Sequence, residues 1–160
     1  MEVTYGAEFF PLAQPSGELT FREGIMQLQE YMQTLESTLE NCTLRHIFAP
    51  GSYAREMTIP KGMLIIGKIH KHAHLNIISK GKVRVATEFG PIYFEAPHTF
   101  VSEVGTKRAV YALEDTIWTT IHVTEETDLA KIEDYVIAKS YEELEALGLS
   151  PSAKIEGVMP

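Results

Sequence analysis

The sequence predicts an all-β protein, an antiparallel barrel with an amphipathic helix before it and helices after it. Apolar residues alternate with other residues in short runs between residues 42 and 124, and turn residues separate most of these runs. The connections between the runs are too short for the crossover helices that parallel strands require. A length of 160 residues fits one domain better than two.

An amphipathic helix is expected from Thr20 to Glu40. Thr20 and Glu23 form the T-x-x-E pattern of a capping box, which satisfies two free backbone groups at a helix start. Apolar residues then recur at spacings of three and four: Ile25, Leu28, Met32, Leu35 and Leu39. This stripe fits a helix on the flank of the barrel, and it also fits a short heptad seam between two copies of the chain.

Eight or nine short strands follow this helix. The β-like runs are Cys42–Ala49, Tyr53–Ile59, Met63–His70, Leu75–Ser79, Lys82–Glu88, Pro91–Glu95, Thr99–Ser102, Arg108–Leu113 and Thr116–Thr124. Glycine and proline mark turns between most of them, as in Pro60-Lys61-Gly62 and Lys80-Gly81. Short strands at such regular spacing are typical of a β-sandwich or barrel.

The C-terminal part returns to helical spacing. Leu129, Ile132 and Val136 recur at helical intervals, and Ser140 with Glu143 marks a second helix start that Gly148 ends. The expected organisation is an N-terminal arm and helix over 1–41, a barrel over 42–124 and a helical tail over 125–160. The tail packs on or beside the barrel, so the whole chain forms one domain.

The charge balance excludes some partners. The chain has 22 acidic and 14 basic residues and a formal charge of −8, which argues against broad nucleic-acid binding. No run approaches the ~18 apolar residues of a membrane span, so no membrane partner is expected. Residues 1–10 lack the basic start of a signal peptide, and a single cysteine fits a reducing compartment, so a cytoplasmic location is expected.

Histidines gather at one place in the sequence. Three of the six lie in His70-Lys71-His72-Ala73-His74, between two expected strands. His122 lies on the last expected strand and shares a face with Trp118. Imidazoles serve both as transition-metal ligands and as acid–base groups near neutral pH. These histidines therefore predict a polar pocket, of which Trp118 is either a wall or part of the adjoining core.

Residues 42–124 resemble the cupin family. The cupin first motif runs from a glycine through His-x-His and a glutamate to a closing glycine, and the second motif runs from a glycine through Pro-x-Gly to His and Asn. The likeness is strongest to small cupin-like proteins of bacteriophages and prophages. It is carried by Arg55-Glu56-Met57-Thr58-Ile59-Pro60, Gly67-Lys68-Ile69-His70, His74-Leu75-Asn76-Ile77-Ile78-Ser79-Lys80-Gly81 and Trp118-Thr119-Thr120-Ile121-His122. It implies a cupin jelly-roll barrel, encoded by a phage and working in the host cytoplasm.

The resemblance transfers only in part to individual residues. With Gly81 as the closing glycine, the family's glutamate falls on His74, its second histidine on His70 and its first on Lys68. The metal-binding histidine of the second motif falls on Arg108. Two cations therefore stand at positions where the family holds metal ligands, and a nearby positive charge disfavours a bound cation.

These residues support two kinds of site. The first is an anion site of Lys68, His70, His74 and Arg108, in which the guanidinium would grip a carboxylate or phosphate through paired hydrogen bonds. Its ligand would be a small anionic metabolite or nucleotide. The second is a site for one divalent transition metal (Fe, Mn, Ni or Zn) held by His70, His74 and His122.

Three functions follow from these sites, and the sequence leaves them open. The first is ligand binding without turnover, and the second is a metal-dependent enzyme acting as an oxygenase, lyase or isomerase. The third is a structural protein whose copies associate through the Thr20–Glu40 helix, because a homo-oligomer is expected. No residue is singled out as catalytic, so enzyme activity is undecided at this stage.

Overall fold

The computed structural model describes residues 20–35, 39–87 and 90–149. Its largest sheet has the strand order β1 (Thr43–Ala49), β2 (Ser52–Ile59), β10 (Thr116–Val123), β5 (His74–Lys80) and β8 (His98–Ser102). A second sheet has the order β3 (Leu64–Ile66), β9 (Ala109–Ala112), β6 (Lys82–Thr87) and β7 (Gly90–Glu95). A third joins β11 (Ile137–Ala138) to β4 (Ile69–His70).

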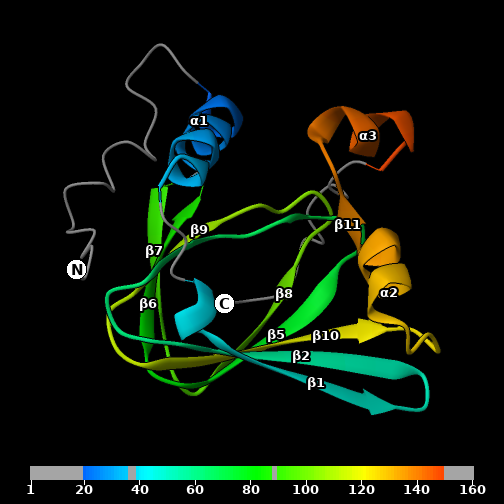
Figure 1. Ribbon diagram of the computed structural model, residues 1–160, viewed down its shortest axis with the longest axis horizontal. Helices are drawn as coiled ribbons and strands as arrows, with labels where there is room; N and C mark the ends of the chain where they lie inside the picture. Colours follow the sequence, from blue (N-terminus) through cyan, green and yellow to red (C-terminus); the bar gives the residue numbers. More distant parts are fainter. Residues whose placement is uncertain (1–19, 36–38, 88–89, 150–160) are drawn as a thin grey trace, which may run out of the picture.

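The antiparallel β class is confirmed. Every strand pairing in these sheets is antiparallel, and the sheets account for most of the fold, with a few helices (Figure 1). Within the described residues the strands form three separate hydrogen-bonded sheets and no continuous ring. No helix in the described part of the chain is both long and apolar enough to cross a membrane.

One expected strand is wrong. Met63–His70 is not continuous, because β3 ends at Ile66 and β4 begins at Ile69. At the break the Gly67 N–H donates to the Arg108 carbonyl at 2.8 Å, and a Cβ on Gly67 would lie 3.5 Å from that oxygen. After the break the chain leaves β9 and pairs with β11 instead.

The main core lies between the two larger sheets. It consists of apolar residues from alternate strand positions: Ile59, Ile78, Val83, Val85, Val110, Ala112 and Trp118. Burial of these side chains is the main force that holds the sheets together, because it removes apolar surface of both sheets from contact with water. The inward faces of these strands therefore carry apolar residues of the short runs seen in the sequence.

Helix α1 (Phe21–Gln33) covers the outside of the second sheet. The capping box of Thr20 and Glu23 is present, and Ile25 and Leu28 are buried. These two side chains pack in a cluster with residues of β3, β6 and β9: Leu64, Ala86 and Ala109. Ile25 and Leu28 are therefore covered within one chain, as the flank interpretation expects.

The expected end of this helix at Glu40 is wrong. The Thr34 N–H and hydroxyl both donate hydrogen bonds to the Tyr31 carbonyl, at 3.0 and 2.7 Å, and these bonds end the helix before Glu40. A short 3₁₀ helix, η2, follows at Leu39–Asn41, and residues 36–38 lie outside the described part.

The C-terminal segment packs over one end of the sheets (Figure 1). Helix α2 (Leu129–Val136) is capped by Asp128 and buries Ile132 and Val136 against Tyr53. Helix α3 (Tyr141–Ala146) begins at the expected Ser140 cap and buries Leu144 against the β4–β11 pair. The sequence interpretation missed strand β11, which lies between the two helices, because a strand of two residues is too short to show an alternating pattern.

Candidate functional site

Three imidazoles meet between β4, β5 and β10. The ring centroids of His70 and His74 are 4.1 Å apart, and those of His74 and His122 are 4.8 Å apart. His70 and His122 are separated by 5.8 Å. The three come from distant positions because β5 and β10 are neighbours in the large sheet and β4 leads into β5.

The three imidazoles are neutral at pH 7. Burial, followed by the charges of His74 and His122, lowers the pKa of His70 to about 3. Burial and His74 lower the pKa of His122 to about 4, and burial also lowers the pKa of His74. Each ring therefore keeps a lone pair that can accept a hydrogen bond or coordinate a cation.

A buried hydrogen-bond network adjoins this cluster. Ser102 Oγ accepts from Arg108 Nη1 at 2.6 Å and from Asn76 Nδ2 at 2.7 Å. The Trp118 Nε1–H donates to Asn76 Oδ1 at 2.9 Å. The network links the candidate site to the apolar core across β8, β5 and β10, and its polar atoms are held in fixed positions.

Arg108 supplies positive charge next to the imidazoles. Burial lowers the pKa of its guanidinium to about 10, so it remains charged at pH 7. Its charge acts on His70 and His74, where it adds to the effect of burial on their pKa values. The guanidinium also lies over the Phe100 ring, 5.4 Å from the centroid. Among the described residues, none forms an ion pair with it.

The structure does not bring Lys68 together with the three imidazoles. Its side chain is exposed and forms an ion pair with Glu133 of α2, away from the three imidazoles. The expectation assumed that Lys68 and His70 share one face of a continuous strand. The break at Gly67 ends that strand, so the alternation of faces does not carry through.

Of the remaining sequence candidates, His122 lies in the imidazole cluster, and His72 and Trp118 lie outside it. His122 lies in the cluster, whereas the His72 ring packs 4.5 Å from the Tyr135 ring of α2. Trp118 is 9% exposed and lies in the main core, and it contacts the site network through its indole N–H.

Sequence reasoning missed Arg55 of β2. In the sheet register Arg55 lies opposite Thr120 of β10, on the same face as Tyr53. After burial and His74, its charge is the next cause that lowers the pKa of His122. The signal was present in the alternation of β2, because Tyr53, Arg55, Met57 and Ile59 share one face. An arginine that shares a strand face with three apolar or aromatic residues is a candidate site residue.

No family profile matches this sequence, and no curated protein matches it. Similar solved structures include KdgF from Halomonas sp., with 16% identity and a TM-score of 0.48 over 58% of this chain and 88% of that chain. They also include a cupin-2 domain protein from Shewanella frigidimarina, with 11% identity and a TM-score of 0.44 over 61% and 92%. A cupin superfamily protein from Desulfitobacterium hafniense has 9% identity and a TM-score of 0.46 over 57% and 84%. At these values the likenesses say nothing about a ligand or a reaction.

Proposed function

We propose that this protein binds a small anionic metabolite or nucleotide between its two larger sheets, with Arg108 as the main anion-binding group. The observation that carries this proposal is the partly buried Arg108 guanidinium, which has no carboxylate partner in the described residues. A guanidinium has five N–H donors, and the bond to Ser102 uses one of them. A bound carboxylate or phosphate would supply the missing negative charge.

We also infer that the two larger sheets form a jelly-roll barrel of the cupin type. The strand orders β2–β10–β5–β8 and β3–β9–β6–β7 are those of two interleaved Greek keys. The motif likeness around His70, His74 and Gly81 supports the same inference. The further likeness to bacteriophage proteins supports a phage-encoded protein of the host cytoplasm.

The neutral imidazoles complement Arg108 in this proposal. His70, His74 and His122 keep their lone pairs at pH 7, so they accept hydrogen bonds from hydroxyl or amino groups of a ligand. The site therefore favours a ligand with one anionic end and nearby hydrogen-bond donors, such as a hydroxy acid or a nucleotide.

A thermal-shift screen of anionic metabolites and nucleotides tests the proposal. A ligand at one hundred times its dissociation constant stabilises the protein by about 2.7 kcal/mol. We expect Arg108→Gln to abolish this stabilisation. The control is Arg45→Gln. Arg45 is an exposed arginine on β1, and it pairs with Glu56 on β2. Equal stabilisation of the wild type and Arg108→Gln by the same ligand would contradict the proposal.

A second candidate function is a metal-dependent enzyme. The three imidazole centroids lie 4.1–5.8 Å apart and their pKa values are lowered, so His70, His74 and His122 are the residues that would supply nitrogen ligands to a divalent transition metal. The Arg108 charge opposes such a cation. When bound, the metal would supply Lewis acidity to a water or substrate, and Arg108 would orient an anionic substrate beside it.

Elemental analysis of the purified protein separates the two candidates. A near-stoichiometric metal that is lost in His70→Ala/His74→Ala and retained in His72→Ala would support the enzyme. The His72 control removes an imidazole from the same segment whose ring packs on Tyr135 instead. No bound metal after reconstitution with iron, manganese, nickel or zinc would rule out the metal site.

A further inference from the structure

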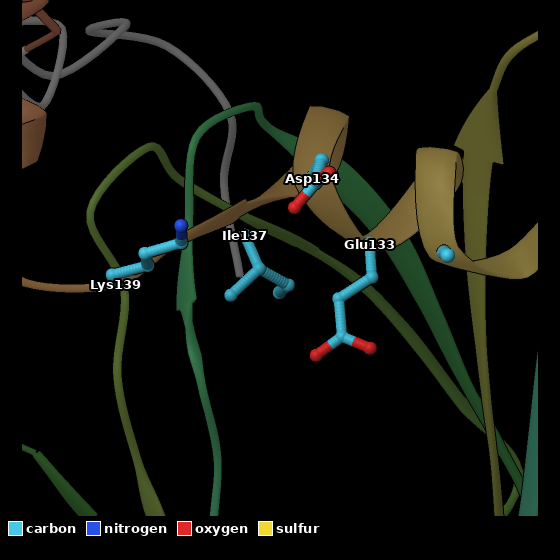
Figure 2. Close-up of a pocket in the computed structure, with 5 residues that line it drawn as sticks. Glu133, Asp134, Ile137 and Lys139 are labelled. Carbon is cyan, nitrogen blue, oxygen red and sulfur yellow. The ribbon is translucent and has the colours of Figure 1, made fainter.

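A cleft of about 430 Å³ lies outside the sheets, between α1 and the C-terminal segment. Its walls come from α1, the β3–β4 break, Lys107 and the α2–β11 segment. A smaller cleft of about 230 Å³ shares Glu133, Ile137 and Lys139 with it (Figure 2). None of the three clustered histidines lines either cleft, so this space is distinct from the candidate site above.

The larger cleft is positively charged in an otherwise acidic protein. Lys68, Lys107 and Lys139 line it, and Glu133 is the one carboxylate among its described lining residues. Glu133 pairs with Lys68, which leaves the charges of Lys107 and Lys139 without a carboxylate on the cleft wall. The whole chain has a formal charge of −8, so this concentration of lysines is local.

Lys107 is the most informative of these residues. It is only 7% exposed, and its Nζ donates to Gln29 Oε1 at 2.6 Å and to the Gly67 carbonyl at 2.8 Å. Both acceptors are neutral, and an ammonium has a third N–H to donate. Burial lowers the pKa of Lys107 to about 8, because no anion compensates for the lost hydration.

The rest of the wall is apolar. Met26 of α1, Ile66 of β3, Ile69 of β4 and Ile137 of β11 all line the cleft. Ligand pockets typically measure roughly 300–1,000 Å³ and combine apolar walls with a few polar groups. The cleft therefore fits a compact ligand that has one charged end and a short apolar body.

We propose that this cleft is a second binding site, for a small organic anion whose carboxylate contacts Lys107 and whose apolar body lies against the isoleucines. Lys139 has no carboxylate partner on the cleft wall and attracts the anion, and the buried Lys107 ammonium holds it. The site is independent of the interior site, because no residue of the Arg108 network lines it.

Calorimetric titration with hexanoate at pH 7 tests the proposal. Hexanamide serves as the neutral probe of the same length. We expect hexanoate to bind and hexanamide to bind at least tenfold more weakly, because charge-assisted hydrogen bonds are about twice as strong as neutral ones. Equal binding of the two probes would overturn the proposal.

Variants identify the site at which hexanoate binds. Lys107→Met keeps most of the side-chain length and removes the charge, and we expect it to weaken hexanoate binding roughly tenfold. Lys80→Met is the matched control, since Lys80 is an exposed lysine at the end of β5, outside the cleft. Arg108→Gln should leave hexanoate binding unchanged, and a loss in that variant would place the probe in the interior instead.

A second pair of measurements covers the case in which Lys107→Met does not fold. The rim double variant Lys68→Gln/Lys139→Gln alters exposed side chains, and we expect it to weaken hexanoate binding several-fold. In the wild type, affinity should also decline between pH 7 and pH 9 as Lys107 loses its proton. The charged groups that face the same cleft are Lys68, Glu133 and Lys139. Unchanged affinity in the double variant, or across this pH range, would overturn the proposal.

Discussion

At the scale of single residues, Asn76 joins the apolar core to the candidate site. It is 1% exposed, accepts the indole N–H of Trp118 and donates to Ser102. Because Trp118 is itself buried, removing the amide leaves its indole N–H without an acceptor, whereas Ser102 Oγ keeps its bond from Arg108. An unpaired buried polar group costs roughly 1–3 kcal/mol, since it has also lost its bonds to water.

We therefore expect Asn76→Leu to lower the free energy of unfolding by about 2 kcal/mol. Urea denaturation monitored by Trp118 fluorescence measures this change. Asn41→Leu is the control, because Asn41 is exposed in η2 and should change stability by no more than about 0.5 kcal/mol. A loss in Asn76→Leu as small as that of the control would show that the network does not stabilise the fold.

The histidine cluster predicts a pH dependence of stability. In the folded protein the pKa of His70 is about 3 and that of His122 about 4, against an ordinary value of 6.5. Below pH 6.5 the unfolded chain therefore binds protons that the folded protein does not, and the free energy of unfolding falls as the pH falls. The contribution is complete above pH 6.5.

Urea denaturation of metal-free protein between pH 7.5 and 5.5 measures this effect. The carboxylates with lowered pKa values titrate below 4.5, outside this window. We expect His122→Gln to flatten the profile and His72→Gln to keep its slope. A flat profile in the wild type would mean that the three imidazoles are solvated.

At the scale of elements, turn geometry decides where strands end. Gly81 connects β5 and β6 with a φ of +87°, and a Cβ there would lie 2.4 Å from the Asp115 carbonyl and 2.5 Å from Thr116 Oγ1. Gly62 has a similar φ of +86°, with no atom within 4 Å of an added Cβ. The two glycines therefore separate the cost of backbone strain from the cost of a steric clash.

We expect both Gly62→Ala and Gly81→Ala to lower stability, and Gly81→Ala to cost more. Backbone strain at a positive φ costs roughly 1–2 kcal/mol in either variant. The clash at Gly81 should add about 1–3 kcal/mol, because the obstructing atoms include backbone. Thermal denaturation of the two variants gives the difference directly, and equal losses would show that the β10 start moves aside.

At the scale of the whole molecule, the outer face of the large sheet carries an apolar row. In the strand register Ile47, Ala54, Ile121, Leu75 and Val101 lie side by side across all five strands. Ile47, Leu75 and Val101 are 41%, 46% and 53% exposed. The charged side chains on this face of β1, β2 and β10 are Arg45 and Glu56, which pair with each other.

We expect a homo-oligomer in which two copies bring these faces together. Two acidic chains repel each other over most of their surfaces, and this face is both neutral and apolar. The α1 contact considered from the sequence is less suitable, because Ile25 and Leu28 are already buried. Sedimentation of the wild type and Leu75→Glu/Val101→Glu measures the mass, which should fall to that of one chain in the variant.

Tyr93→Glu is the control for this experiment, since Tyr93 is an exposed aromatic residue on β7 of the other sheet. Its mass should match that of the wild type. A wild type with the mass of one chain would contradict the prediction of an oligomer, and an unchanged mass in the double variant would move the contact to another face.

Much of the fold could be predicted because its causes are local. The alternation in Tyr53–Ile59, the turn at Gly81 and the caps at Thr20 and Ser140 each depend on a few neighbouring residues. The shared face of Trp118 and His122 followed from the same alternation. The positions of Lys68 and Arg55 could not be predicted in this way, because the inward face of a strand depends on where that strand is interrupted and on what covers it.

The sequence by itself determined the antiparallel β class, most of the strand positions, the starts of α1 and α3 and the gathering of histidines near β4 and β5. Only the tertiary structure decided that His122 completes the imidazole cluster, that Lys68 faces the outer cleft and that Lys107 is a buried cation. Period and turn chemistry act over a few residues along the chain. Burial, ion pairing and pKa values depend on residues that are distant in sequence, and these are brought together only when the sheets and the C-terminal segment pack.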